Sequence, residues 1–63
     1  MPVITVAMDK ASEGQKQKLV QNLTKEAAEI TQKPVEHFIV YIQEYPHENI
    51  GMGGKTIKEI RGS

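Results

Sequence analysis

The feature that most constrains this chain is a long amphipathic helical pattern between two short apolar segments. Residues 2–8 are rich in β-branched side chains and predict a strand, and residues 38–44 predict a second one. Between them, side chains recur at helical spacing in the series Lys16, Leu19, Val20, Leu23, Ala27 and Ile30. Because about 20 helical residues separate the two strands, parallel pairing is the economical arrangement. The sequence therefore predicts a βαβ unit of the α/β class.

Local signals define both ends of the predicted helix. Ser12 followed by Gln15 fits a capping box, in which each side chain bonds the backbone N–H at the other position. Pro34 disfavours helical geometry at the residue before it, so the helix should end near Gln32.

The predicted second strand has two different faces. Alternation places Phe38, Val40 and Ile42 on one face, and Ile39, Tyr41 and Gln43 on the other. The first set can pack against the helix. The second set leaves Ile39 and Tyr41 exposed unless another molecule covers them. Residues 2–8 are also nearly all apolar, which suggests that the first strand is buried on both of its faces.

The size of the chain also favours self-association. Its 63 residues allow one domain, 1–63, and a domain of this size buries only about 60% of its unfolded surface. Cysteine is absent, and the two histidines, His37 and His47, have no cluster of partners around them, so neither disulfides nor a metal is expected to stabilise it. Self-association is therefore the expected means of stabilising so small a domain.

Charge and hydropathy exclude several classes of partner. Eight basic and eight acidic residues cancel, which gives little support to nucleic-acid binding. No apolar run approaches the roughly 20 residues of a membrane span, and the N-terminus lacks a signal-peptide pattern. We expect a cytoplasmic protein without membrane or nucleic-acid partners.

Glycines dominate the segment that follows the second strand. Ile50-Gly51-Met52-Gly53-Gly54 predicts a turn or short hairpin, with one or two helical turns within residues 55–61. Gly54-Lys55-Thr56 matches the end of a phosphate-binding loop, but Asn49 stands where its first glycine belongs. The hairpin is the favoured interpretation.

Pro2 is the candidate chemical residue. Met1 precedes a small, rigid residue, which is the context in which initiator methionine is normally cleaved. Its removal would convert the Pro2 nitrogen from an amide into a free secondary amine that can act as a base. An ordinary proline at the start of a strand is the structural alternative.

Together these features resemble the 4-oxalocrotonate tautomerase family over the entire chain. The shared features are Pro2 opening a strand, Ser12-x-x-Gln15-Lys16 at the helix start, Pro34, Glu44 ending the second strand, and Gly51-Met52-Gly53-Gly54. The resemblance implies a homohexamer with active sites at subunit interfaces, a dimer being the alternative. It also implies an isomerase in which the Pro2 amine moves a proton in an enol or unsaturated 2-oxo acid, without metal or cofactor.

The chain departs from the family at its substrate-binding positions. The loop after the first strand lacks the family's arginine and offers Lys10, while Ile39 and Ile50 occupy the positions of a second arginine and an aromatic residue. Arg61 matches a family arginine, and Tyr41 is a candidate hydroxyl donor to a substrate oxygen. Each of these residues also has a purely structural interpretation: Lys10 as a solvent-exposed loop charge, Tyr41 as a packed aromatic, and Arg61 as a subunit-interface contact. We expect weaker activity on dicarboxylates than on monocarboxylate or aryl enols, and a non-catalytic binding or assembly protein of the same fold is the alternative function.

Overall fold

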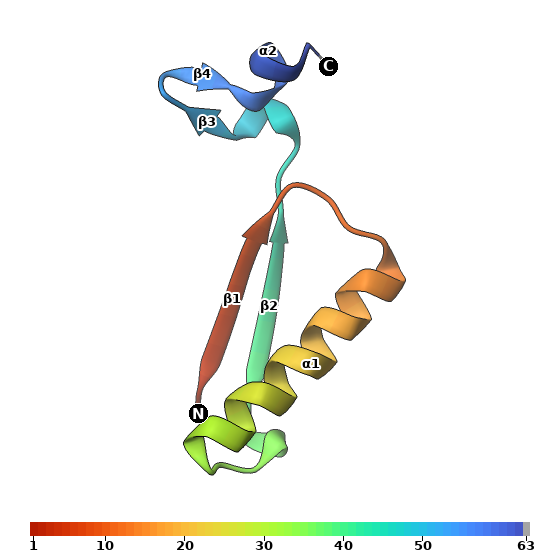
Figure 1. The fold of residues 1–63 in the computed structure, drawn as a ribbon, viewed down its shortest axis with the longest axis vertical. Coiled ribbons are helices and arrows are strands. Elements are labelled where there is room, and N and C mark those ends of the chain that lie inside the picture. The colour runs from red at the N-terminus through yellow and green to blue at the C-terminus, as the bar shows by residue number, and fades with distance from the viewer. Residues whose placement is uncertain (63) are drawn as a thin grey trace.

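Two parallel strands and one long helix form the body of the molecule, and a small C-terminal arm stands beyond them (Figure 1). The structure is a computed structural model that describes residues 1–62, so Ser63 of the predicted domain lies outside the described residues. In chain order the elements are β1 (Val3–Met8), α1 (Glu13–Thr31), the 3-10 helix η1 (Val35–His37), β2 (Ile39–Glu44), the 3-10 helix η2 (His47–Asn49), β3 (Gly51–Met52), β4 (Lys55–Thr56) and α2 (Ile57–Arg61).

The sheet confirms the predicted parallel pairing. β1 pairs with β2 in a register that begins with Val3 opposite Ile39 and ends with Met8 opposite Glu44. The side chains of alternate residues are partly buried on the face toward α1, at Ile4, Val6, Met8, Val40 and Ile42. The other face, which we call the open face, carries Val3, Thr5, Ala7, Ile39, Tyr41 and Gln43, all exposed except the partly buried Ile39.

Both predicted ends of α1 are confirmed. The Gln15 backbone N–H donates to Ser12 Oγ at 3.1 Å, and the Ser12 N–H donates to Gln15 Oε1 at 2.9 Å, which completes the capping box. At the other end Gln32 adopts a left-handed conformation with φ of 59°, and its N–H donates to the Ala28 carbonyl. The chain can therefore leave the helix before Pro34.

The glycine-rich segment forms the predicted hairpin. β3 pairs antiparallel with β4, and the two residues between them, Gly53 and Gly54, have φ of 64° and 89°. Positive φ at both central residues is the requirement of a type I′ turn, which glycine meets without steric cost. Thr56 then caps α2, so Gly54-Lys55-Thr56 lies in a hairpin and at a helix cap, and the phosphate-loop alternative is not supported.

A single chain leaves much apolar surface uncovered. Ala28 is the one buried hydrophobic residue in the described part of the chain, and Val3 and Tyr41 are 51% and 55% exposed. The radius of gyration is 15.0 Å, against about 11 Å for a compact domain of this length. The shape and the open face both suit a subunit of an assembly. Within residues 1–62, no helix combines the length and the apolar character needed to cross a membrane.

Candidate active site

Pro2 lies at the amino end of the sheet, immediately before β1. It is partly buried, and its carbonyl accepts a hydrogen bond from the Ile39 N–H at 3.1 Å. This bond extends the β1–β2 ladder by one residue and fixes the direction in which the Pro2 ring leaves the sheet. Met1 is 86% exposed, so the peptide bond that must be cleaved to free the Pro2 nitrogen lies at the surface.

Two further predicted site residues share the open face with the start of β1. Ile39 is opposite Val3 and Tyr41 is opposite Thr5 in the parallel register. The structure thus places Ile39 directly beside Pro2, while Tyr41 lies two residues further along the same face.

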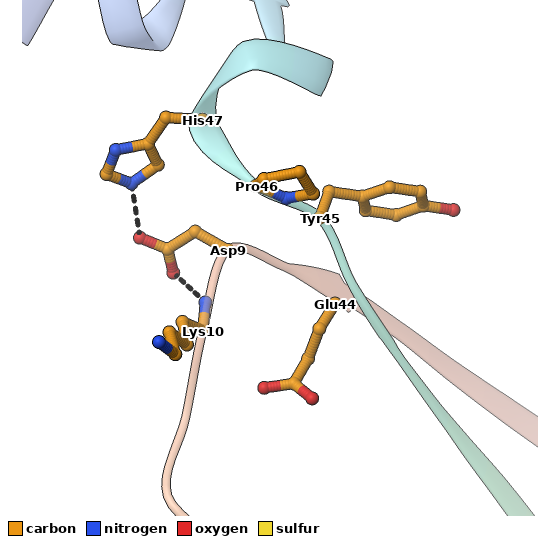
Figure 2. A pocket seen from close by; sticks show the side chains of 6 residues that line it. All are labelled: Asp9, Lys10, Glu44, Tyr45, Pro46 and His47. Atoms are coloured by element: carbon orange, nitrogen blue, oxygen red, sulfur yellow. Dashed lines mark hydrogen bonds and ion pairs between the residues drawn. The ribbon is translucent and has the colours of Figure 1, made fainter. Parts of the chain in front are cut away.

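Lys10 lies at the opposite, carboxyl edge of the sheet. The six residues of β1 and Asp9 lie between it and Pro2, and β1 alone spans about 20 Å at the usual rise of a strand. Lys10 lines a hollow of about 460 Å³, which we call the edge pocket, together with Asp9, Glu44, Tyr45, Pro46 and His47 (Figure 2). Ligands of open parallel sheets bind at this edge of the strands in general.

Two carboxylates hold the loop that carries Lys10. Asp9 Oδ1 accepts the Lys10 backbone N–H at 2.8 Å, and Asp9 Oδ2 lies 3.2 Å from His47 Nε2 (Figure 2). Glu44 Oε2 accepts the Ala11 N–H at 3.0 Å, so the backbone N–H groups of Lys10 and of the residue after it are both bound. The loop is therefore tied to the end of β2 and to η2.

Hydrogen bonds and nearby charges lower the pKa values of Glu44 and Asp9. The hydrogen bond from Lys16 Nζ, at 2.9 Å, is the largest cause that lowers the pKa of Glu44 below its ordinary range, followed by the Ala11 N–H. The Lys10 backbone N–H is the largest cause that lowers the pKa of Asp9, followed by the bond to His47. Both carboxylates are stabilised in their charged forms.

The remaining predicted residues lie on the C-terminal arm. The Ile50 carbonyl accepts the Ile57 N–H at 2.8 Å, which ties the start of the hairpin to α2, and Ile50 is partly buried. Arg61 is exposed at the last turn of α2. In Figure 1 the arm stands beyond the carboxyl ends of β1 and β2, at the far end of the molecule from the N-terminus.

One chain therefore does not bring the predicted residues into one site. Pro2, Ile39 and Tyr41 share the sheet, Lys10 lies at its far edge, and Ile50 and Arg61 lie on the arm. Among residues 1–62, no group of three or more histidine or acidic side chains is placed to hold a metal ion.

Sequence reasoning did not identify the contacts that bind the Lys10 loop. His47 was an isolated histidine in the sequence, yet it reaches Asp9 across 38 positions, and Lys16 reaches Glu44 across 28. The pair of Lys16 with Glu44 could have been expected from the parallel βαβ pattern, because in this pattern the end of β2 lies near the start of the helix.

Comparison with known proteins identifies the family. The family model described as "Tautomerase enzyme" matches residues 2–60. A probable tautomerase from Bacillus cereus (strain ATCC 14579) is 33% identical over 60 residues, which cover 94% of this chain and 98% of that protein. The chain therefore belongs to the tautomerase family.

Solved structures place it among the 4-oxalocrotonate tautomerase homologues of that family. TomN, a 4-oxalocrotonate tautomerase homologue in the tomaymycin biosynthetic pathway, is 33% identical with a TM-score of 0.93, over 98% of this chain and 97% of that one. The heterohexamer 4-oxalocrotonate tautomerase from Chloroflexus aurantiacus J-10-fl is 26% identical with a TM-score of 0.83, over 97% of this chain and 98% of its own. The fold expected from the resemblance is confirmed.

Proposed function

We propose that this protein is a tautomerase in which the free amine of Pro2 is the general acid and base. The observation that carries the proposal is the position of Pro2. Pro2 lies immediately before β1 and is partly buried, and its carbonyl accepts a hydrogen bond from the Ile39 N–H. The peptide bond that precedes it lies at the surface. The family match begins at the same residue.

The proposed reaction needs one base and no cofactor. The neutral Pro2 nitrogen accepts a proton from one position of an enol or unsaturated 2-oxo acid, and the resulting ammonium returns a proton to a carbon of the same substrate. Atoms and charge balance within the substrate. Burial of the amine beside apolar side chains such as Val3 and Ile39 in the assembled site would disfavour its charged form.

The complete site is proposed to form between subunits of a homohexamer. In one chain Pro2 is about 20 Å from the Lys10 edge of β1, so Lys10, Ile50 and Arg61 reach Pro2 only from other copies. The open face offers the surface for that contact, and one relative of 26% identity is a heterohexamer. Lys10 is proposed to pair with a substrate carboxylate, and the Tyr41 hydroxyl to donate to a substrate oxygen.

The test compares free and blocked forms of the same N-terminus. Mass spectrometry first identifies the mature N-terminus, which should be Pro2. Ketonisation of phenylenolpyruvate is then followed with the free amine, after acetylation of Pro2, and in a preparation that retains Met1. Only the free amine should be active, and Pro2→Ala, a primary amine, should keep partial activity. Equal turnover by all forms would refute the proposal, and activity in none would favour a non-catalytic binding or assembly protein.

A further inference from the structure

Lys10 is not the only charged residue that lines the edge pocket. Two carboxylates, Asp9 and Glu44, share its lining with Lys10, and each would attract the Lys10 ammonium and repel a substrate carboxylate. A lysine can serve as an anion site here only if other groups engage these two carboxylates.

Both carboxylates have hydrogen-bond partners in the structure, and Glu44 also has a cation partner. Glu44 Oε1 forms an ion pair with Lys16 Nζ at 2.9 Å, and the two side chains are about equally covered, with 34% and 35% of their surfaces exposed. The second oxygen of Glu44 accepts the Ala11 N–H. Both oxygens of Asp9 are also engaged, by the Lys10 backbone N–H and by His47.

Among residues 1–62 the Lys10 ammonium forms no ion pair, because Lys16 pairs with Glu44 and His47 contacts Asp9, the second contact being an ion pair only when the imidazole is protonated. It nevertheless lies within electrostatic reach of Glu44, because its charge is one of the smaller causes that lower the pKa of that carboxyl. Glu44 thus has two cations within reach and is bonded to only one of them.

We propose that Lys16 determines substrate specificity as a positioning residue: by engaging Glu44, it leaves the Lys10 ammonium free to bind a carboxylate ligand. This inference rests on the proposed role of Lys10. Without Lys16, the Glu44 carboxylate would both compete for Lys10 and repel an incoming anion. The effect of Lys16 is therefore exerted through Glu44, without contact between Lys16 and the ligand.

A rescue experiment separates this mechanism from a structural one. The variants are Lys16→Gln, Glu44→Gln and the double variant, with Lys16→Arg as the conservative change and Lys25→Gln as a matched loss of one positive charge elsewhere on α1. The amide that replaces the carboxylate in Glu44→Gln retains an oxygen that can accept the Ala11 N–H, so the loop contact survives in the double variant. The readouts are the Kd of 3-phenylpropionate, a non-reactive monocarboxylate, and kcat/KM for phenylenolpyruvate and for an uncharged aryl enol.

Lys16→Gln should weaken binding of the carboxylate about twofold to fivefold, the range of a partly exposed charge contact. Turnover of the uncharged enol should not change. The double variant should regain the affinity of Glu44→Gln, and the Lys16→Arg and Lys25→Gln variants should bind as the original protein does. An unchanged Kd in Lys16→Gln, a loss that Glu44→Gln does not rescue, or no binding by the original protein would overturn the inference.

The same measurements distinguish this inference from the proposed function. If the original protein binds 3-phenylpropionate with the expected pattern across the variants but does not turn over the enol, catalysis by Pro2 fails while the role of Lys16 stands. If Lys10→Ala binds the carboxylate as tightly as the original protein, the assignment of Lys10 fails, and the inference about Lys16 fails with it.

Discussion

Removal of the Tyr41 side chain should weaken the assembly more than any other single truncation on the open face. Tyr41 is 55% exposed in one chain, which leaves about 110 Å² of a tyrosine's roughly 200 Å² uncovered. Burial of that area at about 25 cal/mol per Å² contributes roughly 2–3 kcal/mol per subunit. Tyr41→Ala should therefore weaken each subunit contact by about 30-fold or more, since about 1.4 kcal/mol is a factor of ten.

Sedimentation equilibrium at micromolar concentration is the assay, with circular dichroism to show that the variant keeps its helix. Val20→Ala is the control, because Val20 is also partly exposed, at 40%, but lies on α1, which covers the other face of the sheet. We expect the proposed hexamer to dissociate in Tyr41→Ala and to persist in Val20→Ala. The same assembly state for Tyr41→Ala and the original protein would refute burial of the open face.

Three further predictions concern the stability of the subunit, each measured as the free energy of unfolding in urea at one protein concentration. Ser12→Ala removes the capping contact to Gln15 and should cost about 1 kcal/mol; no loss would mean that the cap is dispensable. Gly54→Ala should cost about 1–2 kcal/mol because φ is 89° there and no atom lies within 4 Å of the added Cβ, so backbone strain alone acts, whereas Gly14→Ala on the helix, with equal space, should stabilise slightly. The hydrogen bond from Lys16 lowers the pKa of Glu44 below its ordinary value of 4.5, so that the stability from this pair is present above pH 4.5 and is lost as pH falls through the lower pKa of the folded state. Glu44→Gln should therefore reduce the loss of stability on acidification below pH 4.5, and an unchanged acid profile would show that the pair contributes nothing.

The fold could be predicted because its signals are local. The capping residues Ser12 and Gln15, the stop before Pro34 and the paired glycines of the hairpin each act within a few positions of the chain. The parallel pairing followed from the length of the helix between two strands. Each of these features depends on backbone conformations that a few neighbouring residues favour, so it can be recognised in the sequence.

The site could be predicted only in part because its contacts are not local. The pairs Asp9 with His47 and Glu44 with Lys16 join positions far apart in the chain and depend on where β2 ends relative to the loop after β1. The separation of Lys10 from Pro2 is local by contrast, because a strand over residues 2–8 already places the two at opposite ends. The sequence did not show which groups bind the loop that carries Lys10.

The amine of Pro2 is proposed to be the acid and base of the reaction. The most direct test is a titration of the Pro2 nitrogen by ¹⁵N NMR, compared with the pH dependence of kcat/KM for phenylenolpyruvate in the same protein. We predict that the nitrogen titrates at the pH where the rising limb of kcat/KM has its midpoint, below the ordinary range of a prolyl amine. A nitrogen that titrates well away from that midpoint, or a rate that persists when the nitrogen is fully protonated, would contradict the account.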